Sequence, residues 1–407
     1  MIEAFLAIVL AAIAVGELPP FLFNRPTLAL VGAILVLVLG VVPLQVAYAA
    51  IDWNTLALLF AMMVFTTHLR LAGFFDLAGQ TLARSSRSPW LFLLFLLLAG
   101  ALLSAFFIND TIALVLTPLV AQVTLAAGLN PLPFLVALAV SSNIGSMATP
   151  IGNPQNILIA TSSGLGFGDF AAALTVPALA SLALAWVLIV VVYRRDWTTK
   201  LLPPPSPRRA RVHLGLMVKC GLSLAVMIAG FLVGWNLALS ALAGAAVLLF
   251  TRRVRPSKVL ARIDGSLLLF FAALFVVTRA VEATGGFQAL LRWALPLLGG
   301  NLGLFSTVAA VLSNLISNVP AVMVLKPVVP SLADPHQAWI ALAAASTLAG
   351  NLTLFGSVAN LIVAESARKF GIKLGFVEYL KVGVPLAVGS IALTAGWLIL
   401  TSPGIPR

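Results

Sequence analysis

The sequence predicts an all-α polytopic membrane protein made of two inverted-topology repeats, each with a re-entrant helical hairpin and a broken transmembrane helix. Three observations predict this class: the composition, the placement of positive charge, and two polar strings that recur about half a chain apart. Of the 407 residues, 61% are hydrophobic and 9% are charged. Such a chain cannot cover itself with polar surface as a soluble domain does, so the bilayer must be its solvent.

Apolar runs separated by polar turns predict the elements in chain order. In the first half they lie near 2–18, 28–44 and 54–71, in a longer interrupted region from 90 to 163, and at 172–193. In the second half they lie at 214–234, 237–251 and 266–282, in an interrupted region from about 301 to 367, and at 382–401. We therefore expect a first transmembrane repeat over 1–193, a polar linker over 194–213 and a second repeat over 214–407.

The placement of the 24 Lys and Arg residues orients these elements. Cytoplasmic loops of membrane proteins carry an excess of positive charge. With the linker placed in the cytoplasm, most of the basic residues fall in loops on that side, whereas the loops 45–53 and 164–170 on the other side have none. We expect a multi-pass protein of the cell membrane, with its amino terminus outside, a cytoplasmic linker, and two halves of opposite orientation.

Two polar strings inside the interrupted regions are duplicated. Leu103-Ser104 and Asn109 return as Leu312-Ser313 and Asn318, at a constant offset of 209. The string 143–156 (NIGSMATPIGNPQN) returns at an offset of 204 as 347–360 (TLAGNLTLFGSVAN). They predict hairpins over about 90–127 and 301–330, and broken helices over about 132–163 and 338–367. A duplicated pair of hydrophobic segments interrupted by Gly or Pro indicates the binding site of a secondary transporter.

Each predicted hairpin has a polar tip, formed by Asn109, Asp110 and Thr111 in the first repeat and by Asn318 in the second. A helix that stops and restarts leaves free backbone groups, which the membrane interior tolerates only inside protein or beside water. The restarting helix directs its positive dipole end at any bound anion. These residues could simply cap helices, but their duplication favours substrate or ion binding.

Asp110 is the acidic residue expected to matter most, because it lies in a hairpin tip and its repeat mate, Val319, is uncharged. Burial disfavours the charged form of an unpaired carboxylate, so we expect Asp110 to carry a coupling proton. The alternative is a Na⁺ site formed by Asn109, Asp110 and the 145–153 loop.

The interrupted helices supply the other wall of the expected site. Unwound backbone at the membrane midplane exposes carbonyls that can coordinate a cation and amides that can hold an oxyanion. The alternative is a kink in which small residues pack closely, and the matched pair of segments favours binding. The expected binding residues are Asn143, Gly145, Thr149, Gly152 and Asn153 in the first repeat, and Gly350, Asn351, Thr353, Gly356 and Ser357 in the second.

Four strings, SAFFINDTIALVLTP, SNIGSMATPIGNPQN, SNLISNVPAVMVLKP and STLAGNLTLFGSVAN, together with the closing GFVEYLKVGVPLA, resemble the ion-transporter superfamily. That group includes arsenite/antimonite efflux pumps, NhaD-type sodium/proton antiporters, metal–citrate carriers and sodium-coupled dicarboxylate carriers. The resemblance implies inverted repeats whose hairpins and interrupted helices meet at a central site. Asn109 and Asn318 match the Asn of the Ser-Asn-Thr tip of the dicarboxylate carriers, whereas Asn-Asp at 109–110 looks like the arsenite-pump branch.

The expected function is secondary active transport of a small anion or metalloid oxyacid resembling arsenite or antimonite, by proton-coupled efflux and alternating access. The alternatives are Na⁺-coupled transport of di- or tricarboxylates or sulfate, Na⁺/H⁺ antiport, and a membrane scaffold. No nucleophile elbow, Walker loop or HExxH motif indicates an enzyme, and the spacing of the three His and of Cys220 indicates no metal site.

The partners expected from the sequence are a small inorganic or organic anion or metalloid substrate, the lipid bilayer, and a second copy of the chain in a homodimer. The net charge of +12 is assigned to membrane topology and not to nucleic acid. We expect no cofactor, only the coupling ion H⁺, with Na⁺ as the alternative.

Overall fold

The computed structural model describes residues 6, 8–9, 12, 24–85, 88–197, 212–250, 254–285 and 300–401. Within these ranges every regular element is a helix, and seven helices are long and apolar enough to cross a membrane. The predicted all-helical membrane architecture is therefore confirmed. Most of the span expected near 2–18, residues 198–211 of the linker and residues 286–299 lie outside the described residues.

The described helices follow one another along the chain without any intervening strand. Those of the first half are α2 (Arg25–Val38), α3 (Leu44–Ala50), α4 (Trp53–Ala72), α5 (Phe74–Ser85), α6 (Pro89–Phe106), α7 (Asn109–Ala126), α8 (Leu132–Met147), α9 (Pro154–Ser163) and α10 (Phe167–Val192). Those of the second half are α11 (Leu214–Val233), α12 (Leu237–Leu249), α13 (Pro256–Leu260), α14 (Gly265–Ala283), α16 (Leu302–Ile316), α17 (Asn318–Leu325), α18 (Pro335–Ala349), α19 (Val358–Arg368) and α20 (Phe376–Thr401).

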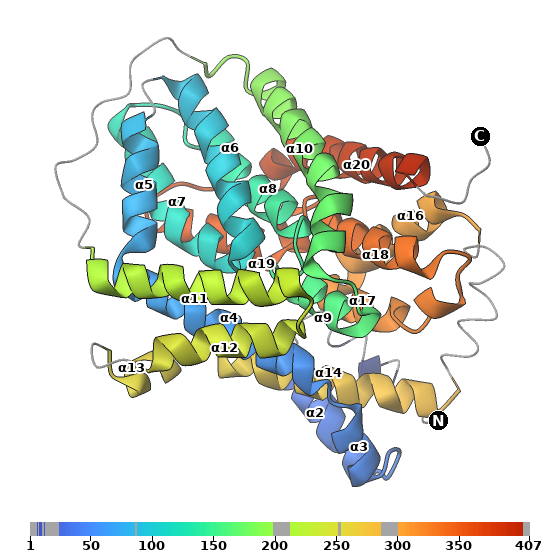
Figure 1. Cartoon of the computed structure of the whole chain (residues 1–407). Helices are drawn as coiled ribbons and strands as arrows, with labels where there is room; N and C mark the ends of the chain where they lie inside the picture. Colours follow the sequence, from blue (N-terminus) through green and yellow to red (C-terminus); the bar gives the residue numbers. More distant parts are fainter. Residues whose placement is uncertain are drawn as a thin grey trace.

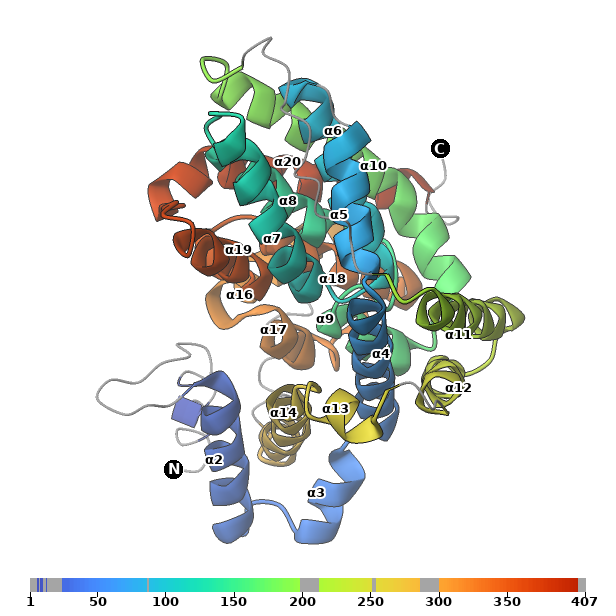
Figure 2. The ribbon, with the colours of Figure 1, turned by 90° about the vertical axis from the view of Figure 1, so that its left-hand side faces the viewer.

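The helices form two layers that are visible in two perpendicular views (Figures 1 and 2). The smaller layer contains α2–α4 and α11–α14, and the larger body contains α5–α10 and α16–α20. In the smaller layer, helices of the two halves pack on each other, α2 on α14 and α12 on α4. Helices of the first half therefore pack directly on helices of the second half in this layer.

The helix caps of the smaller layer repeat at an offset of 212. Asn24 and Asn236 cap α2 and α12, and Asp52 and Asp264 cap α4 and α14, each side chain accepting a backbone N–H of the first turn. Such caps satisfy backbone donors that have no partner within the helix. The duplication therefore extends beyond the two polar strings.

Matched pairs of helices also build the larger body. α6 packs on α8, and α16 packs on α18 in the same way. The 26-residue helices α10 and α20 pack on each other, and each contains an internal proline, Pro177 and Pro385 respectively. A proline removes one helical hydrogen bond and displaces the preceding turn, so the two longest helices are bent at corresponding places.

The hairpins and broken helices turn where the sequence interrupts the helical pattern. The first hairpin turns at Phe107 and Ile108, and the second at Ser317. Ser317 has a φ of 77° and is the only non-glycine residue with positive φ within the described ranges. α8 and α18 end at residues 147 and 349, and α9 and α19 begin at residues 154 and 358; the chain between them leaves the α-helical path, and the second segment contains only the short 3₁₀ helix Leu354–Gly356.

Candidate functional site

The centre of the candidate site is the side chain of Asn143 on α8, which is 1% exposed. Its Nδ2 donates to Oδ1 of Asn351 (3.0 Å) and of Asn360 (3.1 Å). Its Oδ1 accepts from Nδ2 of Asn109 (3.1 Å) and from Oγ of Ser357 (3.0 Å). One amide thereby uses its full hydrogen-bonding capacity and joins the first hairpin tip to the second broken helix.

The contacts between the two repeats are reciprocal. Ser357 of the second repeat donates to Asn143 of the first. At the offset of 204, Ser357 is equivalent to Asn153 and Asn143 is equivalent to Thr347. The equivalent bond is present: Asn153 donates through Nδ2 to Oγ1 of Thr347 at 3.2 Å. The Asn143 bond to Asn360 likewise has a counterpart, in which Thr347 donates to Oδ1 of Asn156 at 3.3 Å. Contacts in which i meets j and j meets i are the signature of a two-fold relation. The two repeats therefore meet face to face at this network.

Asn156 and Asn360 fix the shape of the two unwound loops. Their side-chain amides donate to the carbonyls of equivalent residues: Asn156 to Ser146 (3.0 Å) and Thr149 (3.1 Å), and Asn360 to Gly350 (2.7 Å) and Thr353 (3.1 Å). Unwound backbone inside a membrane protein must find such partners. Asn156 and Asn360 thus replace the hydrogen bonds that a continuous helix would have made.

Thr149 and Thr353 connect each loop to the hairpin of its own repeat. Thr149 donates through its hydroxyl to the carbonyl of Ala105, and Thr353 donates to Oδ1 of Asn314 at 3.4 Å. Residues 105 and 314 are themselves equivalent at the offset of 209. In the first repeat the N–H of Asn109 also donates to the carbonyl of Gly152 at 3.1 Å.

Close backbone approach explains one glycine of α8, Gly145, and one of the loop that follows it, Gly152. A Cβ at Gly145 would collide with the backbone of Ala101 on α6, and one at Gly152 would lie 2.5 Å from the carbonyl oxygen of Ser146. The corresponding Gly356 lies beside Asn314 and the carbonyl of Gly350. These glycines therefore allow the hairpin and the loop of each repeat to touch.

The two hairpin tips differ in their hydrogen bonds. Asn109 is buried and bonds to Asn143, whereas Asn318 is half-buried and accepts from Oγ of Ser313 at 2.8 Å. Ser104 is the mate of Ser313, and its buried hydroxyl has no hydrogen-bond partner within the described chain. The structure is thus two-fold in its loops but asymmetric at its tips.

Asp110 and Thr111 lie beside the network and not within it. Both are half-buried in the first turn of α7. The structure shows no side-chain hydrogen bond or ion pair for either residue among the parts of the chain that it describes. The expected site residues Asn109, Asn143, Asn153, Asn351 and Ser357 are therefore brought together, and Asp110 lies one residue from them.

Several participants were not among the residues expected from the sequence. Thr347 has no side-chain amide, so only its equivalence to Asn143 at the offset of 204 indicated that it belongs to the site. Asn156 and Asn360 carried the same signal. Arg25, at the start of α2, donates through Nη1 to Oγ of Ser317 at 3.2 Å. Nothing in the hairpin strings indicated that contact.

The network around Asn143 offers only the oxygen and nitrogen groups of uncharged side chains and of the backbone, and charged groups lie at its edges: the Asp110 carboxylate beside the first tip and the Arg25 guanidinium at the second. Among the described residues, no three His, Cys, Asp or Glu side chains lie close enough to hold a metal ion. Amide and backbone oxygens near Asp110 could ligate Na⁺, a hard cation. Nδ2 of Asn351 is buried and has no hydrogen-bond partner in the described ranges, which leaves its two N–H donors available to a ligand.

Comparison with known proteins gives a consistent result for the whole chain. Residues 6–349 match the family model described as citrate transporter, CitMHS. An uncharacterized transporter of Mycobacterium tuberculosis is 35% identical, over 86% of this chain and 87% of the relative. The silicon efflux transporter LSI3 of Oryza sativa subsp. japonica is 30% identical, over 97% and 94%. The putative transporter arsB of Dictyostelium discoideum is 26% identical, over 90% and 85%.

Two solved structures share the fold. The Alcanivorax borkumensis YdaH transporter aligns with a TM-score of 0.60 at 19% identity, over 98% of this chain and 97% of that one. The Neisseria gonorrhoeae MtrF structure aligns with a TM-score of 0.59 at 16% identity, over 100% and 96%. At these identities the likeness concerns the architecture alone.

Proposed function

Because this chain belongs to the CitMHS citrate transporter family and is a secondary transporter of that type, we propose that it exports a small metalloid oxyacid in exchange for protons. Arsenous acid and silicic acid are the substrates that fit this proposal. Both are small, polyhydroxylated and uncharged at neutral pH. The proposed cycle is alternating access around the network centred on Asn143.

One observation carries the choice of substrate: the buried network between the repeats is made of uncharged groups. Its described hydrogen bonds join side-chain amides, hydroxyls and backbone carbonyls. A neutral oxyacid can exchange hydrogen bonds with such groups, including the unpartnered Nδ2 of Asn351. Burying a multiply charged carboxylate there would be costly, because buried charge requires a paired opposite charge.

The relatives support the same class of substrate. The rice relative is named a silicon efflux transporter, and the Dictyostelium relative carries the name arsB. Both cover at least 90% of this chain.

Asp110 is the proposed carrier of the proton. It lies next to Asn109, which bonds directly to Asn143, and the described chain provides no ion-pair partner for it. A carboxylate without a partner in a membrane protein can be neutralised by a proton at modest cost. Proton binding at Asp110 would then change the charge beside Asn109, the tip residue that bonds to the network.

Reconstituted protein provides the test. Liposomes with an imposed pH gradient are loaded with arsenite or silicic acid, and uphill movement is compared for the native chain, Asp110→Asn and Asp76→Asn. Asp76 is an exposed carboxylate on α5 and is the matched control. We expect Asp110→Asn to lose uphill transport but keep downhill exchange, and Asp76→Asn to behave as the native chain. Uphill transport by Asp110→Asn would contradict the coupling role.

A second candidate is Na⁺-coupled transport of a di- or tricarboxylate. It is favoured by the guanidinium of Arg25, which reaches the second hairpin tip at Ser317 and could attract a carboxylate. In the same liposomes, citrate or succinate uptake that requires Na⁺ and is indifferent to a pH gradient would select this candidate over oxyacid export.

A further inference from the structure

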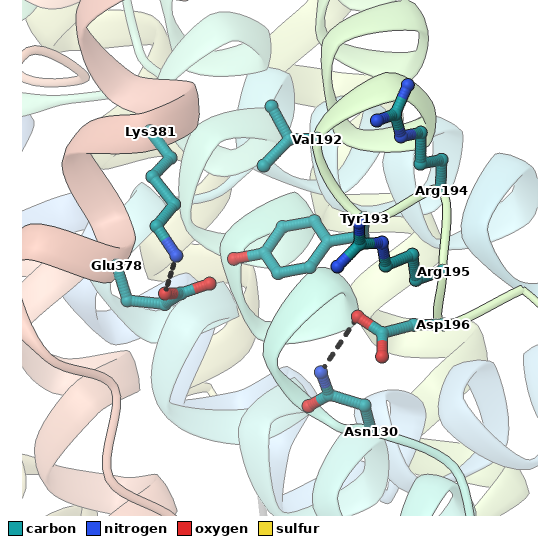
Figure 3. A pocket seen from close by; sticks show the side chains of 8 residues that line it. All are labelled: Asn130, Val192, Tyr193, Arg194, Arg195, Asp196, Glu378 and Lys381. Atoms are coloured by element: carbon teal, nitrogen blue, oxygen red, sulfur yellow. Dashed lines mark hydrogen bonds and ion pairs between the residues drawn. The ribbon is translucent and has the colours of Figure 1, made fainter.

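A polar pocket of about 380 Å³ lies away from the central network, where α10 ends and α20 begins (Figure 3). Its charged lining comes from both halves of the chain. Tyr193, Arg194 and Arg195 follow α10, whereas Glu378 and Lys381 lie in the first turns of α20. The pocket is thus formed where the two longest helices meet at one end of the molecule.

Two of the charged groups that line this pocket, both guanidinium groups, form no ion pair among the described residues and could bind an anion. Lys381 and Glu378 form an ion pair of 2.5 Å, and Asp196 accepts a hydrogen bond from Asn130 at 3.1 Å. Arg194 and Arg195 are exposed and form no ion pair within the described part of the chain. The pocket therefore has an excess of positive charge and can accept an anion.

Tyr193 supplies a second, independent sign of a ligand. The residue is 5% exposed, and its buried hydroxyl makes no hydrogen bond of ordinary geometry among the described residues, although the Glu378 carboxylate is close enough to influence it. Figure 3 shows the hydroxyl pointing across the pocket toward Glu378 and Lys381. Burial and the neighbouring Glu378 carboxylate raise the pKa of Tyr193, so the hydroxyl stays protonated and can donate. The Glu378 carboxylate is already paired with Lys381, so a bound oxyanion would give this buried donor an acceptor of its own, and a buried donor left without a good acceptor is costly.

The surroundings of the pocket indicate that the anion belongs to a lipid. Trp197, next to Asp196, stacks on Trp90 at 4.7 Å between ring centroids, and Trp90 lies 6.3 Å from Trp186. Tryptophan is enriched at the level of the lipid headgroups. Val191 on α10 and Val384 on α20 are 59% and 40% exposed, which provides apolar surface for acyl chains on both helices.

We propose that this pocket binds the phosphate group of an anionic phospholipid through Arg194, Arg195 and the Tyr193 hydroxyl. Arginine pairs with phosphate through directed, charge-assisted hydrogen bonds, and basic pockets between membrane helices bind acidic headgroups. The proposal does not depend on which substrate the central network accepts.

A bound headgroup would also affect the central site through α20. Gly383 lies half a turn beyond Lys381 on this helix, and a Cβ added there would lie 2.5 Å from the carbonyl oxygen of Asn351. The first turns of α20 therefore touch both the pocket and the second unwound loop. We expect the lipid to stabilise the folded protein by holding these turns in place.

The test uses the full-length protein in neutral detergent, with unfolding temperature as the readout. Phosphatidylglycerol is titrated into the micelles, with phosphatidylcholine and inorganic phosphate as separate arms. We expect phosphatidylglycerol alone to raise the unfolding temperature. For Arg194→Gln/Arg195→Gln we expect its apparent affinity to fall by roughly tenfold or more, as loss of charge-assisted bonds predicts. Tyr193→Phe, which removes only the hydroxyl, should weaken binding by a smaller factor.

Arg255→Gln/Lys258→Gln is the matched control, because it removes two positive charges from α13 in the other layer (Figure 1). It should respond to phosphatidylglycerol as the native chain does. An equal loss in the control and in the pocket variant would overturn the site, because the effect would then be one of net charge. An equal response to inorganic phosphate would overturn the phospholipid assignment in favour of a free-anion site.

Discussion

At the scale of single residues, Asn143 is the side chain on which the central network depends. Asn143→Ala would leave Asn109, Ser357, Asn351 and Asn360 without their shared partner. An unsatisfied buried polar group costs about 1–3 kcal/mol, so we expect a fall of at least that size in the free energy of unfolding, with loss of transport. Asn301→Ala, which removes one helix cap on α16, should cost only about 1 kcal/mol. Similar losses in thermal unfolding would contradict the hub role.

Ser317 is a second residue with a specific prediction. Its φ of 77° and ψ of 157° fall in a region that is essentially reserved for glycine, and such conformations cost on the order of 1–3 kcal/mol at functional sites. Ser317→Gly should therefore raise the unfolding temperature while transport slows, because the contact with Arg25 is lost. Ser331→Gly, at the exposed last residue of the 3₁₀ helix Val329–Ser331 and without positive φ, should instead destabilise slightly, because glycine loses more backbone freedom on folding. Destabilisation by both variants would rule out strain at the tip.

At the scale of elements, the crossing of α6 and α8 depends on Gly145. A methyl group at this position would collide with the backbone of Ala101, and overpacking of this kind typically costs about 1–3 kcal/mol. We expect Gly145→Ala to lower the unfolding temperature and to separate the first hairpin from its loop. Gly168→Ala is the control, because a Cβ there meets nothing within 4 Å. Unchanged stability of Gly145→Ala would show that the two helices can move apart freely.

The positions of the helices and their breaks could be predicted from the sequence better than the contacts between them. Polar residues that interrupt apolar runs locate the hairpin tips near Asn109 and Asn318, because a helix in lipid can break only where its backbone is satisfied. The contacts between the two repeats could not be predicted, since Asn143 and Asn351 are more than 200 residues apart and meet only through packing. The contact of Arg25 with Ser317 could not be predicted for the same reason, because it depends on how α2 packs on α14.

At the scale of the whole molecule, the two repeats are equivalent in their loops and different at their tips. Thr149 and Thr353 make equivalent contacts, whereas Asn109 bonds to the network and Asn318 bonds to Ser313. In a transporter built of inverted repeats, alternating access moves one part against another around a fixed site. We therefore expect the asymmetry to belong to one of two states, and the other state to exchange the roles of the two tips.

Ser104 is the residue through which this exchange can be tested. In the opposite state Asn109 should leave Asn143 and bond to Ser104, as Asn318 bonds to Ser313 here. Ser104→Ala should keep or slightly raise the stability of the present state, because the hydroxyl is buried and without a partner in the described chain. Ser313→Ala should lower that stability by about 1 kcal/mol, because its single hydroxyl proton is shared between Oδ1 of Asn318 and the carbonyl of Ser346. Both variants should slow transport in liposomes, because each removes the partner of one tip in one state. Equal effects of the two variants on thermal unfolding, or normal transport by Ser104→Ala, would show that the tips do not exchange roles.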